Sequence, residues 1–464
     1  MANSKSLPAN SQILVQSVKG FLARVLSEQP TSTPSLLLGY SGGLDSSVLL
    51  HILVQCQSEL TFELQAMHVH HGLSVNADAW ADFCKHTCHA YQVPCLVSRV
   101  SVDPTSGLGV EATARTARYT ALQSARADWI CLAHHQDDQA ETLLLQLARG
   151  AGPKGLSGMA TWDVPNKLLR PLLTQSRQAL VQYAKQHQLR WIDDESNQCL
   201  EYDRNFMRHE ILPALARQYP AITKTLSRSA SHMAEVSVLL SDLACIDAQN
   251  AFKYQGKHDV QLDLEQLALL SEIRAKNLLR YWLEQYQVLM PSAEQLQQIL
   301  HQLLAAKPSA NIKLKVGQGL SIRRHLQLAY VVSEHAVLGS YNLLWQGESE
   351  IWLSPYSQLV FEKKLGQGIA LRHLEHAKLR IKNREGSERF RPEQGRPSRT
   401  IKRMMQTHTI PPWQRELIPL IFMEEILATI PNLGVDANLQ AAPDEMGLVI
   451  AWHYHAPEIS NAQH

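Results

Sequence analysis

The first half of the chain alternates between two hydrophobic periodicities. Residues 12–26 carry apolar side chains at the three- and four-residue spacing of an amphipathic helix. Short apolar runs follow at 36–40, 64–70, 94–100 and 129–133, and segments with helical spacing separate them. Buried strands that alternate with helices are typical of a parallel sheet covered on both faces. The pattern therefore predicts an α/β domain.

The pattern changes after Pro220. Residues 221–304 are mostly helical in spacing, residues 312–332 turn β-like, and a β-rich unit follows from about Tyr341. A chain of 464 residues is long enough for about three domains. We therefore predict an α/β catalytic domain at 1–219, a mostly helical middle domain at 220–338 and a small, β-rich α+β domain at 339–464.

The overall charge of the chain indicates no polyanionic partner, but the charge of one segment does indicate such a partner. Lys and Arg number 44 against 43 Asp and Glu, a net charge of +1. Residues 378–403, in contrast, hold ten basic and three acidic side chains. A solvated charged face is the ordinary interpretation of such a run, yet this one is rich in Arg, whose planar fork suits phosphate. The segment is therefore a candidate nucleic-acid contact.

Cysteine usage and the N-terminus predict a soluble protein of the cytoplasm. The 7 Cys are scattered and odd in number, unlike a secreted disulfide framework. The N-terminus shows no apolar signal-peptide region, and no apolar run approaches the roughly 18 residues of a spanning helix. Cys84, Cys88 and Cys95 lack the paired spacing of a zinc site, so we expect core or half-buried thiols rather than metal ligands.

The segment Ser41–Ser46, with the sequence SGGLDS, lies between an expected strand and an expected helix. Its two glycines let the backbone approach a ligand, and the helix directs free N–H groups and its positive end at that ligand. Asp45 does not suit a bare phosphate, so its presence indicates a metal ion between the two. Because the G-x-x-x-x-G-K-[ST] pattern is missing, we infer a phosphate loop that is not a Walker loop.

Two other interpretations of this segment stay open. A strand–turn–helix connection without function also favours Gly and Ser, since a Gly-rich loop is a weak signal by itself. Residues Gly39–Gly43 also satisfy G-x-S-x-G, the nucleophile elbow of hydrolases. The sequence contains no HGGG-type oxyanion loop that would accompany such an elbow. The hydrolase interpretation also leaves Asp45 and Ser46 without a role.

Three further polar segments fall at the carboxyl end of an expected strand or on the next helix. They are 68–73 (HVHHGL), 111–119 (EATARTARY) and 133–142 (AHHQDDQAET). Open α/β sheets bind ligands at these strand ends. Each segment also has an ordinary interpretation: acids suit the first turn of a helix, and Glu111 and Arg115 form an i,i+4 pair. Their combination with the phosphate loop is what points to function.

Together these segments resemble a known family. SGGxDS after a first strand is similar to the PP-loop of the ATP-pyrophosphatase superfamily, which implies an adenine nucleotide alpha hydrolase-like fold. The order of the other segments, extended by 170–172 (RPL), 193–197 (DDESN) and 203–208 (DRNFMR), resembles tRNA(Ile)-lysidine synthetase. The resemblance is dense from about Ser35 to Pro213 and looser beyond.

The resemblance implies a reaction. ATP would adenylate the C2 oxygen of the wobble cytidine in a tRNA(Ile) with a CAU anticodon, releasing pyrophosphate. The side-chain amine of L-lysine would then attack C2 and expel AMP. The implied cofactors are ATP and Mg²⁺, and the implied partners are this tRNA and L-lysine. No membrane is involved, and a homodimer is compatible with the resemblance.

The same resemblance implies roles for individual residues. Asp45 would hold the metal, and Arg115 would be the cation that meets developing charge. The carboxylates of Asp137, Asp138 and Glu141 would bind and deprotonate lysine. The expected nucleotide site consists of Ser41, Gly42, Gly43, Leu44, Asp45, Ser46 and His70. The expected contacts to lysine and tRNA come from His135, Arg204, Asn205, Arg208, Arg389, Arg391, Arg396 and Arg399.

Two other classes of function stay open. Another PP-loop enzyme, such as a tRNA thiolase or a small-molecule amidating synthetase, would share the loop. A thiolase needs a reactive Cys or a cluster, and an amidating synthetase does not need the basic segment. A non-catalytic tRNA-binding protein with a decayed loop is the second class, and the complete SGGLDS and the Asp137–Asp138 pair argue against decay.

Overall fold

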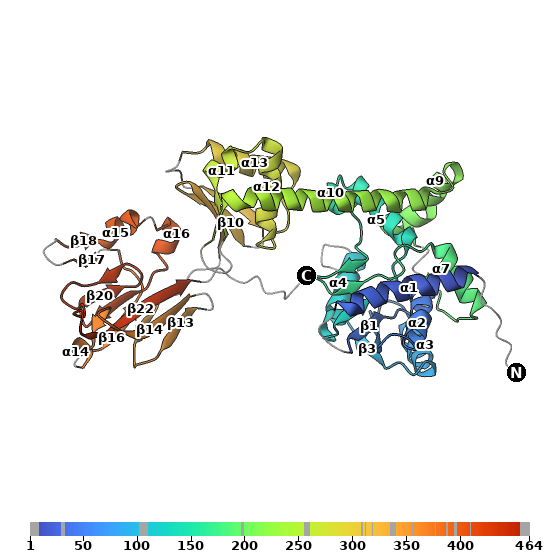
Figure 1. Ribbon diagram of the computed structural model, residues 1–464, viewed down its shortest axis with the longest axis horizontal. Coiled ribbons are helices and arrows are strands. Elements are labelled where there is room, and N and C mark those ends of the chain that lie inside the picture. Colours follow the sequence, from blue (N-terminus) through green and yellow to red (C-terminus); the bar gives the residue numbers. More distant parts are fainter. Residues whose placement is uncertain are drawn as a thin grey trace. The chain divides into compact units, whose positions relative to one another are not determined.

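The computed structural model describes residues 9–28, 33–101, 110–195, 199–254, 260–307, 310, 312–317, 319–334, 340–354, 357–375, 377–386, 388–393, 397–408 and 410–454. The chain divides into two compact units, Met1–Leu239 and Leu240–Gln463. Each unit is described by itself below, with the elements labelled as in Figure 1.

The first unit is built on a six-stranded sheet with the order β3-β2-β1-β4-β6-β5. The four strands that the apolar runs predict are present and parallel. Two strands were not predicted, because two residues are too few to show a periodicity, and one of them, β5, runs antiparallel to β6. The strands are β1 (Ser35–Gly39), β2 (Glu63–His70), β3 (Cys95–Arg99), β4 (Trp129–Cys131), β5 (Trp162–Asp163) and β6 (Leu168–Leu169).

Helices cover both faces of this sheet (Figure 1). Leu36 and Leu38 of β1 face a large core that includes side chains of α1, α2 and α7, whereas Leu37 faces a smaller core with Leu122 of α4. Successive side chains of a strand point to opposite faces, so strands covered on both faces read as continuous apolar runs. The helices are α1 (Ala9–Ser27), α2 (Leu44–Cys56), α3 (Ala77–Ala90), α4 (Val110–Ser124), α5 (Gln136–Ala148), α6 (Pro153–Leu156) and α7 (Arg177–Gln186).

The strand order creates a switch point beside β1. The chain leaves β1 toward β2 and β3 on one side and returns to pair β4 on the other side. Leu38 of β1 pairs with Cys131 of β4, so the carboxyl ends of these two strands are neighbours. Ligands of open α/β sheets bind outside the carboxyl ends at such a point. The loops that follow β1 and β4 therefore meet where a ligand is expected.

A run of short helices follows the sheet: α8 (Asp203–Phe206), a π-helical turn η2 (Met207–Ile211) and α9 (Leu212–Gln218). Single π-helical turns are rare and occur frequently at functional sites. The long helix α10 (Ile222–Ala251) then spans the residue at which the two units divide.

The second unit begins with the expected helical segment. Helices α11, α12 and α13 pack with a five-stranded antiparallel sheet around Trp282, which is fully buried. The residues predicted to be β-like form β9, β10 and β11, while β7 and β8 add two strands that were not predicted. The elements are β7 (Phe252–Tyr254), β8 (Val260–Asp263), α11 (Leu264–Ala268), α12 (Glu272–Glu284), α13 (Ala293–Ala305), β9 (Lys313–Gly317), β10 (Leu320–His325) and β11 (Leu328–Ser333).

The C-terminal part of this unit is β-rich, as expected. Sheets with the orders β12-β16-β19-β20-β21 and β13-β14-β22-β15 share one apolar core with α15. Among the described residues, no helix is long and apolar enough to cross a membrane. The elements are β12 (Asn342–Leu344), β13 (Glu350–Ser354), β14 (Ser357–Leu365), β15 (Ile369–Ala370), α14 (Leu371–Leu374), β16 (Leu379–Lys382), β17 (Arg389–Phe390), β18 (Arg399–Thr400), α15 (Ile401–Thr407), α16 (Pro412–Arg415), β19 (Leu420–Met423), β20 (Ile426–Ile430), β21 (Gly434–Val435) and β22 (Met446–Tyr454).

Candidate active site

The phosphate loop turns sharply between β1 and α2. Gly42 has φ +81°, and a Cβ at this position would lie 2.6 Å from Cδ1 of Ile192 and 3.0 Å from Sγ of Cys84. A side chain is therefore excluded by both the backbone angle and the lack of space. Gly43 is the N-cap residue of α2 and, having no side chain, provides no side-chain cap. The first N–H groups of α2 are thus left for an anion.

Two hydroxyl groups brace the loop from inside. The hydroxyls of Ser41 and Ser46 lie 3.1 Å apart, and the backbone N–H of Gly43 donates to Oγ of Ser41 over 3.3 Å. The hydroxyl of Ser46 donates to the carbonyl of Gly43 over 3.0 Å. Leu44 packs against the core, so only its backbone faces the loop's ligand side. The loop therefore has the preorganised shape of an anion site.

Asp45 offers an oxygen that suits a cation. Its Oδ2 lies 3.5 Å from Nε2 of His135, whereas its Oδ1 is buried and has no hydrogen-bond partner among the described residues. Burial of an unpartnered carboxylate oxygen is costly, and a divalent cation is the kind of partner that removes the cost. The described residues contain no cluster of three His, Cys, Asp or Glu that could hold a metal alone. Phosphate oxygens and water would have to complete its coordination.

His135 connects the phosphate loop to the acids on α5. It is the N-cap residue of α5, is 1% exposed, and forms a reciprocal capping box with Asp138. Burial alone would lower the pKa of His135, but the carboxylates of Asp45, Asp138 and Asp137 raise it above its ordinary value. His135 was expected to contact lysine or tRNA. That contact stays a prediction; the structure places the ring of His135 3.5 Å from both Asp45 and Asp138.

Two buried acids on α5 meet two arginines that lie more than sixty positions further along the chain. Nε of Arg204 donates to Glu141 over 2.8 Å, and its Nη2 donates to Asp138 over 2.8 Å. Nε of Arg208 donates to Glu141 over 2.6 Å, and its Nη2 lies 3.1 Å from Asp138. Burial would raise the pKa of Asp138, but His135, Arg204 and other cations hold it well below its ordinary value. Asp138 is therefore an anion at neutral pH.

Asp137 and Asn205 have different surroundings. Oδ2 of Asp137 accepts the backbone N–H of Arg177 over 2.9 Å and lies 3.8 Å from Nδ1 of His135. Its carboxylate is half-buried and has no guanidinium partner in the described part of the chain. The amide of Asn205 donates to the carbonyl of Cys199 over 2.9 Å, a contact that holds the segment carrying both arginines.

The expected cation Arg115 is exposed on α4, where its guanidinium lies 5.5 Å from the ring centre of Tyr119. Arg118, one turn further along the same helix, lies within electrostatic reach of Asp138 and Arg204, and burial lowers its pKa. The role expected of Arg115 stays a prediction.

His70 is the last residue of β2, and its ring contacts two charged side chains. Its Nε2 lies 3.3 Å from Oδ1 of Asp78 and 3.4 Å from a guanidinium nitrogen of Arg99. The expected contact between His70 and the nucleotide stays a prediction.

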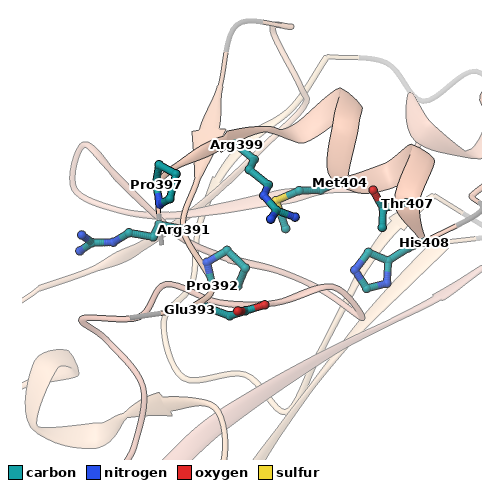
Figure 2. A pocket seen from close by; sticks show the side chains of 8 residues that line it. All are labelled: Arg391, Pro392, Glu393, Pro397, Arg399, Met404, Thr407 and His408. Atoms are coloured by element: carbon teal, nitrogen blue, oxygen red, sulfur yellow. The ribbon is translucent and has the colours of Figure 1, made fainter. Parts of the chain in front are cut away.

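The basic C-terminal segment forms a small hollow. Arg391 and Arg399 line a cavity of about 60 Å³ together with Thr407 and His408 (Figure 2). The side chain of Arg399 points across the hollow toward Met404 (Figure 2). The remaining lining residues are Pro392, Glu393 and Pro397.

Arg389 and Arg396 are the other two expected arginines of this segment. Nε and Nη2 of Arg389 donate to Oγ and the carbonyl of Ser398, which pins its guanidinium at the surface. Arg396 lies outside the described residues. Contacts of these four arginines with tRNA stay a prediction.

The fold and the loop define a PP-loop protein, and matches to three protein-family models agree with that class. Residues 14–215 match a family model described as the PP-loop domain. Residues 262–330 match the TilS substrate binding domain, and residues 379–452 match the TilS substrate C-terminal domain. The expected class of the N-terminal domain is thereby confirmed.

Curated relatives give the particular family. The tRNA(Ile)-lysidine synthase of Nitrosomonas europaea is 39% identical over 425 residues, covering 90% of this chain and 92% of the relative. The enzymes of the same name from Serratia proteamaculans and Coxiella burnetii are 40% and 36% identical, covering 89% and 90% of this chain and 94% and 93% of the relatives. The chain belongs to the tRNA(Ile)-lysidine synthase family of ATP-binding, tRNA-modifying ligases.

Proposed function

We propose that this protein ligates L-lysine to C2 of the wobble cytidine in a tRNA(Ile) with a CAU anticodon, with conversion of ATP to AMP and pyrophosphate. The observation that carries the proposal is the meeting of three features at one switch point. The phosphate loop ends β1, the acids begin α5 after β4, and His135 contacts both Asp45 and the acid group. ATP and an amine would therefore be bound by neighbouring, fixed parts of one site.

In the first step, the C2 oxygen of cytidine attacks the α phosphorus of ATP and pyrophosphate leaves. The loop Ser41–Ser46 binds the departing pyrophosphate through backbone N–H groups and hydroxyls. Asp45, whose Oδ1 has no hydrogen-bond partner among the described residues, would hold Mg²⁺. A bound divalent cation neutralises phosphate charge. Arg118, alongside the expected Arg115, is the cation placed to meet negative charge near the acids.

In the second step, the lysine side-chain nitrogen attacks C2, the C2–O bond breaks, and AMP carries the oxygen away. The amine must first lose a proton to an acceptor whose pKa suits the task. The low pKa of Asp138 makes that residue a poor acceptor and a good electrostatic partner for the ammonium group. Asp137, which has no guanidinium partner among the described contacts, is the acid that we assign to proton acceptance, and Glu141 fixes the arginine pair.

Transfer RNA would be bound by the later parts of the chain. We propose that residues 220–338 and 339–464 are separate substrate-binding domains, in addition to the catalytic domain 1–219. Arg389, Arg391, Arg396 and Arg399 would contact phosphates of the acceptor end. We further propose a cytoplasmic location, where tRNA, ATP and lysine coexist.

The proposal is tested by incubating the protein with ATP, Mg²⁺, labelled lysine and total tRNA, followed by nucleoside analysis. We expect labelled lysidine together with equal amounts of AMP and pyrophosphate. ADP and phosphate as products would overturn the PP-loop chemistry, and a thiolated nucleoside would show a thiolase instead. Omitting ATP should abolish the labelled nucleoside, which serves as the control for ATP-independent attachment of lysine.

A further inference from the structure

Residues 191–195, which follow α7, touch the phosphate loop, and the proposed reaction gives them no role. They include the first acids of the motif 193–197. The chain leaves the end of α7 through Gln188, which has φ +53°, and Trp191 then packs against the large core of the sheet. This path brings Ile192 against the loop that follows β1.

Ile192 contacts Gly42 through both its backbone and its side chain. Its N–H donates to the carbonyl of Gly42 over 2.9 Å, and its Cδ1 lies 2.6 Å from the position that a Cβ on Gly42 would occupy. Sγ of Cys84, a buried free thiol, lies 3.0 Å from that position. The hydroxyl of Ser47 donates to the same carbonyl over 3.4 Å. Two donors therefore hold the carbonyl of Gly42 in one direction.

The direction of this carbonyl decides what the loop presents to an anion. Neither Gly42 nor Gly43 has a Cβ, so a half-turn of the peptide between them meets little steric resistance. The carbonyl and the N–H of a trans peptide point in opposite directions. The carbonyl lies toward Ile192, and the N–H of Gly43 lies toward Ser41, whose Oγ accepts it over 3.3 Å. A half-turn would aim a carbonyl oxygen, instead of an N–H, at a bound phosphate.

A second hydrogen bond fixes the far end of residues 191–195. Nδ2 of Asn76 donates to Oε1 of Glu195 over 3.0 Å. Asn76 is the N-cap residue of α3, but its side chain makes no capping bond and is used for Glu195 instead. Between the two anchors, Nε1 of Trp191 donates to Oδ1 of Asp193 over 3.1 Å. The segment is therefore attached to the loops that follow β1 and β2.

We propose that Ile192 is a positioning residue for the diphosphate part of ATP. Its N–H keeps the peptide after Gly42 in the orientation that turns an N–H toward the nucleotide. Glu195, held by Asn76, keeps Ile192 in place. The inference rests on the proposed function, which gives ATP to this loop. ATP and pyrophosphate both carry a diphosphate, so their binding depends on Ile192, whereas the binding of AMP does not.

The test removes the N–H of Ile192 and keeps its side chain. Nonsense suppression replaces Ile192 with its α-hydroxy acid, which puts an ester oxygen in place of the N–H. The matched control is the same replacement at Leu189, whose N–H donates to the carbonyl of Ala184 over 2.9 Å. Both full-length variants lose one backbone donor from the same stretch of chain, but only the first loses a contact with the loop. Calorimetry with Mg²⁺ gives the Kd for ATP, pyrophosphate and AMP.

For the Ile192 ester we expect the Kd for ATP and for pyrophosphate to rise about fivefold or more, the effect of one lost hydrogen bond at a fixed site. The Kd for AMP should not change, and the Leu189 ester should bind all three ligands like wild type. Wild-type binding of ATP and pyrophosphate by the Ile192 ester would overturn the inference. An equal rise for AMP would also overturn it, because the whole site would then be distorted.

The second anchor is tested on an exposed side chain, where folding is not at risk. Glu195→Gln keeps an oxygen that accepts from Asn76 and should bind ATP like wild type. Glu195→Ala loses the acceptor and should raise the Kd for ATP about twofold. Glu63→Ala, at an exposed acid at the start of β2, is the control and should have no effect. Equal losses in the Gln and Ala variants would show that the charge of Glu195 acts on the ligand, which would contradict a positioning role.

Formation of AMP and pyrophosphate by wild type with tRNA and lysine is measured in parallel. Absence of this activity removes the proposed reaction, while pyrophosphate binding still tests Ile192. Normal activity, together with unchanged diphosphate binding by the Ile192 ester, removes only the positioning role. A wild-type protein that binds neither ATP nor pyrophosphate would remove both.

Discussion

The charged side chains of the candidate active site and those of the basic C-terminal segment differ in burial and in pairing. Around α5, Asp138 and Glu141 are buried, and each is held by two guanidinium groups. In the C-terminal segment, Arg389 and Arg399 are exposed and have no carboxylate partner among the ion pairs of the described residues. Buried, paired charges act at short range and fix geometry, whereas exposed charges attract a polyanion over longer range.

This difference separates chemistry from docking along the chain. Changes in the buried group should alter turnover or folding with little dependence on salt. Changes in the exposed group should alter tRNA affinity with strong dependence on salt.

The largest effect is expected for Asp45→Asn. The change keeps the size of the side chain but removes the charge that would hold Mg²⁺, so adenylation should fall by about 100-fold or more. Turnover of ATP to AMP at saturating tRNA, ATP and Mg²⁺ measures it. Glu294→Gln, at an exposed acid in the first turn of α13, is the control and should leave turnover unchanged. Wild-type turnover of Asp45→Asn would show an ordinary helix-end acid.

Glu141→Gln should mainly affect stability. The change leaves Arg204 and Arg208 short of one buried carboxylate, and breaking such a pair costs about 3–5 kcal/mol. Urea unfolding of the N-terminal unit within the full chain measures the loss. A free energy of unfolding within about 0.5 kcal/mol of wild type would contradict the idea that this network holds the site.

The C-terminal arginines should affect tRNA affinity alone. The triple change of Arg389, Arg391 and Arg399 to Gln should weaken tRNA binding and reduce the salt slope by up to about one unit per lost phosphate contact. ATP binding should not change. A triple change at Arg24, Arg126 and Arg217, which are exposed elsewhere, is the matched control.

Filter-binding titrations at several salt concentrations measure both triple variants. Superimposable curves for the Arg389, Arg391 and Arg399 variant and wild type would make this segment a solvated face only. The tRNA surface would then have to be sought in residues 220–338.

The pKa of Asp138 predicts a dependence of stability on acid. Because that pKa is depressed in the folded protein, the stabilisation is present above the ordinary value of 3.8 and is lost as pH falls toward the folded value. Asp138→Asn, though less stable overall, should therefore lose stability less steeply than wild type below about pH 4. Thermal unfolding between neutral pH and pH 3 measures the two slopes, and equal slopes would contradict the assigned shift.

The smallest effect on activity is expected for the triple change of Cys84, Cys88 and Cys95 to Ser. These thiols touch no expected substrate, so turnover under reducing conditions should stay near wild type. Stability should fall by about 1–3 kcal/mol because hydroxyls replace buried thiols. Loss of turnover in a folded triple variant, or stoichiometric iron or zinc in the wild type, would favour a thiolase.

The sequence determined the parts of this protein that depend on local pattern. Apolar runs predicted β1 to β4, helical spacing predicted the helices between them, and SGGLDS identified the phosphate loop. The short strands β5 and β6 were not predicted, because two residues are too few to show a hydrophobic periodicity. The family resemblance, which rests on motif order, was confirmed by relatives that cover about nine-tenths of the chain.

Only the tertiary structure decided which charged side chains meet. Asp45 and His135 are ninety positions apart, yet they approach within 3.5 Å because β1 and β4 are neighbours in the sheet. Glu141 meets Arg204 and Arg208 because the segment after α7 brings α8 and η2 against α5. The local pattern determines where each side chain lies on its own helix or strand. The strand order and the helix packing determine which other side chain it contacts.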